Sequence, residues 1–128
     1  MAEKACFLVD KIISKLSVFY VTINTHEGAS KLASVLLDKK LIACCNIIGN
    51  AQNPITSIYT WKGKVENDSE VLMMIKSRTE LLPEIVKTVK ENHPYDVPEV
   101  IALPILGGNP EYITWVLDNT KEPEKPSE

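Results

Sequence analysis

Residues 18–23 read Val18-Phe19-Tyr20-Val21-Thr22-Ile23, an unbroken run of mostly β-branched and aromatic side chains. This composition predicts a β-strand. Thr25 follows as a candidate N-cap. The next apolar residues recur at three- and four-residue spacings: Ala29, Leu32, Ala33, Leu36 and Leu37. That spacing predicts an amphipathic helix directly after the strand, so the folded part of the chain begins as a β–α unit.

Strand patterns recur in the rest of the chain. They cover residues 42–48, 55–61, 71–75 and 100–105. Residues 49–54 contain Gly and Pro and predict a bulge or loop that interrupts a long second strand. Gly63, in the Lys62-Gly63-Lys64 turn, suits the positive φ of a hairpin.

Helical patterns fill the remaining intervals. Ser77-Arg78-Thr79-Glu80 resembles a capping box and predicts a helix that starts close to Thr79. Its buried face is expected to be Leu82, Ile85, Val86 and Val89. A turn at 107–110 leads into a last helix, whose apolar and aromatic residues are Tyr112, Ile113, Trp115, Val116 and Leu117.

The order of elements is β-α-β-β-α-β with an extra C-terminal helix. This is the ferredoxin-like arrangement of the α+β class. Right-handed crossovers place the strands at 18–23 and 71–75 in the centre of the sheet. The last strand falls on an edge, where Pro104 is tolerated because its missing N–H is not needed.

The length of 128 residues fits one folded domain. Residues 1–16 have mixed apolar spacings and predict an N-terminal extension with a short amphipathic helix. Residues 17–119 hold the folded domain. Residues 120–128 form a polar tail whose composition predicts disorder.

Both faces of the predicted sheet are apolar. Consecutive apolar residues occur at 19–21, 71–75 and 101–103, and successive strand residues point to opposite faces. Two helices cover one face, and the last helix shields only part of the other. Packing several subunits together would bury the rest, which predicts an oligomer. The alternative is a monomer in which the N-terminal segment folds over that face.

The net charge of −3 argues against a nucleic-acid partner, which requires cationic neutralisation of phosphates. No apolar run is long enough to span a membrane, and the N-terminal run at 5–9 is too short for a signal-peptide core. These features predict a cytoplasmic protein. Two of the three cysteines, Cys44 and Cys45, are adjacent, so reduced thiols are expected.

His93-Pro94-Tyr95-Asp96-Val97-Pro98-Glu99 joins a helix pattern to a strand pattern. Its two prolines stiffen the path and bias the preceding residues toward extended geometry. The segment presents an imidazole, a phenol and two carboxylates, which suits a binding site. The alternative is structural: prolines end helices, and His93 suits a helix C-terminus.

The chain resembles the CutA family, whose members are associated with tolerance of divalent cations. The resemblance covers roughly residues 17–117. The motifs that carry it are Leu41–Ile48, Ser57–Lys64, Met74–Lys76, His93–Val100, Pro104 and Tyr112–Trp115. Two departures are the longer connection at 49–54 and Cys45, where the family more often has an aliphatic residue.

The resemblance implies a ferredoxin-like subunit in a homotrimer similar in architecture to the PII signalling proteins. It also implies binding of copper or another divalent metal, with none obligatory, and no catalytic reaction. An unidentified protein partner is compatible with it.

Three residues are candidate metal ligands: Cys44, His93 and Glu99. Thiolate suits copper(I), imidazole suits copper and zinc, and carboxylate suits harder ions. Each has a structural alternative. Cys44 is equally a small buried hydrophobe, and Glu99 can pair with Lys76. No CxxC or HxxxH spacing predicts a zinc site within one subunit.

Six further residues are candidates for a cleft or an interface: Tyr59, Trp61, Lys76, Tyr95, Asp96 and Trp115. Aromatic residues are more often core or interface anchors, and Trp61 beside the hairpin turn favours that role. Lys76 is either a solvated strand end or an anion contact. The functional hypotheses are a trimeric metal-binding protein in cation homeostasis or a PII-like small-molecule sensor or interaction scaffold. An enzyme is not predicted, because no nucleophile–base set is present.

Overall fold

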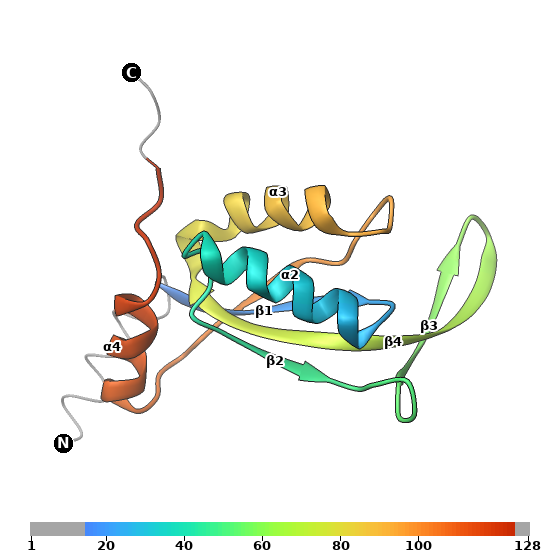
Figure 1. Cartoon of the computed structure of the whole chain (residues 1–128), viewed down its shortest axis with the longest axis horizontal. Coiled ribbons are helices and arrows are strands. Elements are labelled where there is room, and N and C mark those ends of the chain that lie inside the picture. Colours follow the sequence, from blue (N-terminus) through green and yellow to red (C-terminus); the bar gives the residue numbers. More distant parts are fainter. Residues whose placement is uncertain (1–14, 125–128) are drawn as a thin grey trace.

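A β-sheet lies between two helices on one face and a shorter helix on the other in the computed structural model, which describes residues 15–124 (Figure 1). The elements are β1 (Leu16–Ile23), α2 (His26–Asp38), β2 (Cys44–Ile48), β3 (Ile55–Trp61), β4 (Lys64–Arg78), the 3₁₀ turn η1 (Thr79–Leu81), α3 (Leu82–Asn92), β5 (Ile101–Pro104) and α4 (Pro110–Asp118). No helix within these residues is long and apolar enough to cross a membrane.

The strand order is β2-β4-β1-β5, and β3 pairs with the first half of β4. The predicted central pair is therefore confirmed, since β1 and β4 run antiparallel side by side from Leu16↔Arg78 to Ile23↔Val71. The edge position of β5 is also confirmed, with Pro104 opposite Ser17. The ferredoxin-like βαββαβ fold follows from this topology.

Helices α2 and α3 cover one face of the sheet, as Figure 1 shows above the strands. The Thr25 hydroxyl caps α2 by accepting the Gly28 N–H at 2.9 Å, as predicted. The odd-numbered residues of β1 and of the second half of β4, including Phe19, Met73 and Ile75, point into this helix layer and are buried. Burial of each such side chain contributes roughly 1.5–3 kcal/mol.

Helical structure begins at Thr79 as predicted, but as a 3₁₀ turn, and the predicted capping box does not form. No side-chain cap is present at either Arg78 or Leu81. The Ser77 hydroxyl instead donates to the Leu41 carbonyl at 2.5 Å, inside the core. The chain passes through η1, and α3 begins at Leu82 with Pro83 in its first turn, where proline is tolerated. Strand β4 is also longer than the predicted 71–75, because the ribbon with β3 extends it to Lys64.

The opposite face of the sheet is called the open face here. It carries the even-numbered residues of β1, β2 and β4 and the odd-numbered residues of β5 that pair with them, among them Val18, Tyr20, Ile48, Leu72, Met74, Ile101 and Leu103. Helix α4 covers only one end of it, by packing Ile113 and Val116 on Leu16 and Ala43. Ile101 and Leu103 remain 50% and 45% exposed, so much of this face has no cover within residues 15–124.

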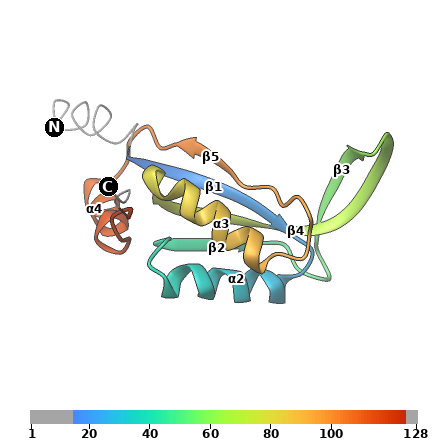
Figure 2. The same cartoon turned by 90° about the horizontal axis from the view of Figure 1, so that it is seen from above.

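Strands β3 and β4 leave the sheet as a two-stranded ribbon that extends past the rest of the molecule (Figure 2). Its turn has positive φ at both Lys62 (52°) and Gly63 (80°), which is the two-residue hairpin geometry. Ile58, Trp61 and Val65 are exposed along it. A ribbon with such side chains is marginally stable alone, so it requires a neighbour.

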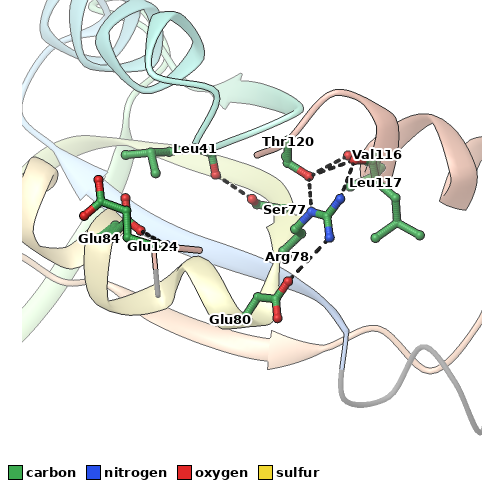
Figure 3. A network of polar contacts seen from close by, with 9 residues as sticks. All are labelled: Leu41, Ser77, Arg78, Glu80, Glu84, Val116, Leu117, Thr120 and Glu124. Atoms are coloured by element: carbon green, nitrogen blue, oxygen red, sulfur yellow. Dashed lines mark hydrogen bonds and ion pairs between the residues drawn. The ribbon is translucent and has the colours of Figure 1, made fainter. Parts of the chain in front are cut away.

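The segment after α4 is bound to the domain. Arg78 donates to the Thr120 hydroxyl and to the Leu117 carbonyl, both at 2.9 Å (Figure 3). The Lys121 ammonium lies 2.6 Å from a Glu84 oxygen on α3. Residues 120–124, expected in the polar tail, thus begin with ordered contacts. The predicted helix in the extension lies almost entirely outside the described residues, and Leu16 belongs to β1.

Candidate functional site

A groove opens between the β3–β4 ribbon and the segment 93–99 that connects α3 to β5. Its volume is about 760 Å³. It is called the acidic groove here, and the residues that line it are Thr22, Ser57, Ile58, Tyr59, Trp61, Asp68, Glu70, Pro94, Tyr95, Asp96, Val97 and Glu99. The groove therefore brings together five of the predicted site residues: Tyr59, Trp61, Tyr95, Asp96 and Glu99.

The connection 93–99 is fastened through His93 and Tyr95. The Tyr95 backbone N–H donates to His93 Nδ1 at 3.1 Å, which requires the other nitrogen, Nε2, to carry the proton. Nε2 then donates to the Thr22 carbonyl at 2.8 Å. The two rings meet edge to face with their centroids 4.7 Å apart. Both nitrogens of His93 are thus occupied by the protein itself.

Glu70 forms the deepest charged part of the groove. It is 6% exposed, and its Oε2 accepts the Tyr95 hydroxyl at 3.0 Å. Burial first, and then this bond to the Glu70 carboxylate, raise the pKa of Tyr95 well above its usual range, so Tyr95 acts as a donor. Burial and the Glu70 charge also raise the pKa of Glu99. The Glu70 carboxylate therefore opposes the ionisation of Glu99.

On the ribbon wall of the groove, the Tyr59 hydroxyl donates to Asp68 across the strand pair. This bond raises the pKa of Tyr59 to about 12, with burial and nearby carboxylates adding to the effect. Tyr59 therefore stays protonated at neutral pH. Asp68 and Glu70 lie two residues apart on β4, so both face the same side of the ribbon.

A second polar group lies on the open face, at the end of the sheet that α4 covers. The Lys76 ammonium lies 3.9 Å from the Cys44 thiol and donates to the Asn46 side chain. These three residues are called the Cys44 cluster here. Tyr112 of α4 lies near this cluster. Burial, and then the neighbouring Cys44, raise the pKa of its phenol. Trp115 stacks on Tyr112 at 5.5 Å.

The two groups are separated along the sheet. Lys76 pairs with Val18, whereas His93 binds the carbonyl of Thr22, four residues further along β1. At about 3.3 Å per residue this separates them by about 13 Å. Cys44 and Lys76 are therefore brought together, as are Tyr95 and Glu99, but neither pair joins the other within one chain. The Glu99–Lys76 ion pair considered from sequence is absent from residues 15–124.

Sequence reasoning missed Asp68 and Glu70 in the groove and Asn46 and Tyr112 at the Cys44 cluster. A signal for Glu70 existed, since it directly precedes the apolar run 71–75 and is drawn into the sheet with it. Within residues 15–124 no three His, Cys, Asp or Glu side chains gather as a metal-ion site. A metal site made by the predicted ligands is thus incomplete in one chain.

The chain matches the family model described as "CutA1 divalent ion tolerance protein" over residues 17–119. It is 48% identical over 105 residues to "Protein CutA 1, chloroplastic" from Oryza sativa, an alignment that covers 82% of this chain and 57% of that protein. It is 42% identical to "Divalent-cation tolerance protein CutA" from Thermus thermophilus, over 80% of this chain and 96% of that protein. The chain spans little more than half the length of the plant and mammalian relatives.

Solved structures agree with this match. The crystal structure of CutA1 from Oryza sativa superposes with a TM-score of 0.80 at 45% identity, covering 88% of this chain and 99% of that one. The Thermus thermophilus protein superposes with a TM-score of 0.78 at 40% identity, covering 83% and 99%. The α+β ferredoxin-like fold with a C-terminal helix is shared by all three chains.

Proposed function

The chain belongs to the CutA1 divalent ion tolerance protein family, and on this premise we propose that it binds copper or another divalent metal as a homotrimer in cation homeostasis. The family is non-enzymatic. The observation that carries the proposal is the open face, which has exposed apolar residues together with the Cys44 thiol and the Lys76 ammonium group.

The proposed trimer rests on the exposed apolar side chains of the open face and the ribbon. Ile48, Ile101 and Leu103 are each 42–50% exposed on a sheet that is otherwise well packed. Contiguous apolar surface of this kind marks an interface with other copies. Such packing is also the arrangement that can complete a metal site which one chain leaves incomplete.

The proposed ligands are Cys44 and Glu99, with His93 the weaker candidate. Cys44 is half-buried on the open face beside Lys76, and cysteine sulfur is a ligand that suits soft copper(I). Glu99 supplies a carboxylate at the groove. His93 fits less well, because a metal at either nitrogen must displace the Tyr95 N–H or the Thr22 carbonyl.

Anaerobic calorimetric titration with copper(I) tests the proposal. Cys44→Ala is expected to lower copper affinity at least tenfold, because the soft ligand is lost. Cys45→Ala is the matched control, since Cys45 points into the helix layer and burial raises its pKa to about 11. It should leave affinity unchanged. His93→Ala and Glu99→Gln, titrated in parallel with zinc, assign the harder ligands. Equal affinities in wild type and Cys44→Ala would contradict a site at Cys44.

A second candidate function is a small-molecule sensor that resembles the PII proteins. The observation that favours it is the volume of the acidic groove, which at about 760 Å³ far exceeds a single ion and falls in the range of ligand pockets. In the proposed trimer, a neighbouring subunit would extend this groove into a cleft between subunits.

We also propose a cytoplasmic location with reduced thiols, which the Cys44 site requires. Relatives are found in different compartments: the rice and Arabidopsis thaliana proteins are named chloroplastic, and the Archaeoglobus fulgidus structure is described as periplasmic. Fractionation of cells expressing the chain, with a thiol-blocking reagent added at lysis, tests both parts of this proposal. A further protein partner remains an open prediction.

A further inference from the structure

Glu70 has a buried carboxyl group that no cationic side chain contacts within residues 15–124. It is more than nine-tenths buried and lines the acidic groove. Its Oε2 accepts the Tyr95 hydroxyl, and no other hydrogen bond or ion pair among the described residues reaches the side chain. A buried carboxylate is costly without a compensating positive charge. The open groove is the side from which such a charge can approach.

The charged residues that line the groove are all acidic, which favours a cationic ligand. Of its twelve lining residues, four are carboxylates and none is Lys, Arg or His. No ion pair among the described residues reaches Glu70 or Glu99. A nucleotide or another phosphate ligand would add negative charge to this site. The electrostatics therefore oppose the anionic ligands that the PII analogy would bring.

The aromatic and apolar walls of the groove favour an organic cation over a bare metal ion. Tyr59, Trp61 and Tyr95 line the groove with aromatic rings, and Ile58 and Val97 add apolar surface. Aromatic faces attract organic cations, whereas hard metal ions require several oxygen ligands in a close shell. The acidic side chains do not converge into such a shell. The groove volume of about 760 Å³ also accommodates a small molecule.

We propose that the acidic groove binds a small aliphatic amine, with a primary ammonium group against Glu70 and Glu99 and the aliphatic body along Tyr59 and Trp61. This site is additional to the proposed copper site. It shares Glu99 with that site but does not involve Cys44.

Calorimetric titration of the full chain tests this site, with 1,4-diaminobutane as the probe. Its uncharged isostere, 1,4-butanediol, and ATP serve as comparison ligands. The diamine is expected to bind, more weakly as salt is raised because the contacts are ionic, and the diol and ATP are not. Glu70→Gln is expected to reduce the affinity at least tenfold. Glu91→Gln removes an exposed carboxylate of α3 outside the groove and should leave affinity unchanged.

Two further variants keep the test decisive if Glu70→Gln does not fold. Glu99→Gln should also cost about tenfold, and Tyr59→Leu, which keeps the carboxylates but removes a ring that lines the groove, should cost several-fold. Cys44→Ala should bind the diamine as wild type does, whatever it does to copper, so failure of one proposal is separable from failure of the other.

Three results would overturn the amine site. They are no diamine binding by folded protein at millimolar concentration, equal affinity in all the acidic variants, and displacement of the diamine by equimolar magnesium. The last result would make the groove an ordinary metal site.

Discussion

Cys44 and Cys45 show how one position along a strand changes the chemistry of a side chain. Cys44 lies on the open face beside the Lys76 ammonium. Cys45 packs against the core under the helix layer. Burial, and then the neighbouring Cys44, raise the pKa of Cys45 from 9.0 to about 11. The two thiols differ because successive strand residues point to opposite faces.

This difference predicts a pH dependence of stability. Because the folded-state pKa of Cys45 lies above the unfolded value, its contribution is complete below pH 9 and is lost as pH rises toward 11. The free energy of unfolding, measured in urea between pH 8 and 11, should fall less steeply in Cys45→Ala than in wild type. Cys44→Ala is the comparison and should keep most of the wild-type slope, because burial is the largest cause of the raised pKa of Cys45 and Cys44 the smaller one. Parallel curves for wild type and Cys45→Ala would refute the assignment.

At the scale of elements, one side chain of β4 adds to the apolar packing that holds α4. Arg78 is the only arginine in the sequence and is largely buried, with its guanidinium across the C-terminal end of α4 (Figure 3). It satisfies the Leu117 carbonyl, one of the last carbonyls that a helix leaves unpaired. The position of α4 over Leu16 therefore depends on a residue of β4.

Removal of this contact should destabilise the domain. Arg78→Ala is expected to lower the free energy of unfolding by roughly 2–3 kcal/mol, because hydrogen bonds to charged groups contribute about 1.5–3 kcal/mol. Arg78→Lys should recover only part of the loss, since an ammonium lacks the planar fork. Lys87→Ala, an exposed change on α3, is the control and should remain within about 0.5 kcal/mol of wild type. All variants are compared at one protomer concentration, and a neutral Arg78→Ala would show that α4 docks through its apolar face alone.

At the scale of the whole molecule, the open face and the ribbon are the surfaces on which one chain leaves apolar side chains exposed. Their exposed apolar side chains predict a homotrimer with an obligate interface, of a kind that often exceeds about 2,000 Å². Sedimentation equilibrium at micromolar concentration should give three times the 14.3 kDa chain mass. A 14.3 kDa species would refute the trimer and return the open face to a monomeric explanation.

The ribbon is expected to contribute to the same assembly. Trp61→Ala should weaken it by roughly 2 kcal/mol or more, because a tryptophan that anchors an interface carries much of its energy. The measurement is the concentration dependence of the denaturation midpoint. Val65→Thr, a milder change on the same ribbon, provides the comparison. A midpoint unaffected by Trp61→Ala would place this side chain outside the interface.

The sequence by itself determined the order of the elements, the central position of β1 and β4 and the apolar character of both sheet faces. These properties follow from local periodicity, from Thr25 as a cap and from the handedness of crossovers, all of which act over short stretches of chain. The start of α3 could not be obtained in this way. The Ser77 hydroxyl that resembled a cap is bound to Leu41, 36 residues away.

Only the tertiary structure decided which candidate residues lie in the acidic groove and which lie in the Cys44 cluster. Strand register places Cys44 opposite Lys76, and the path of residues 93–99 places Tyr95 against Glu70, 25 residues away in sequence. The same path hydrogen-bonds both ring nitrogens of His93, to the Thr22 carbonyl and the Tyr95 N–H, which the motif alone did not indicate. These outcomes depend on pairing and burial between distant segments. A buried carboxylate without a cation is a property of that packing, and no local pattern encodes it.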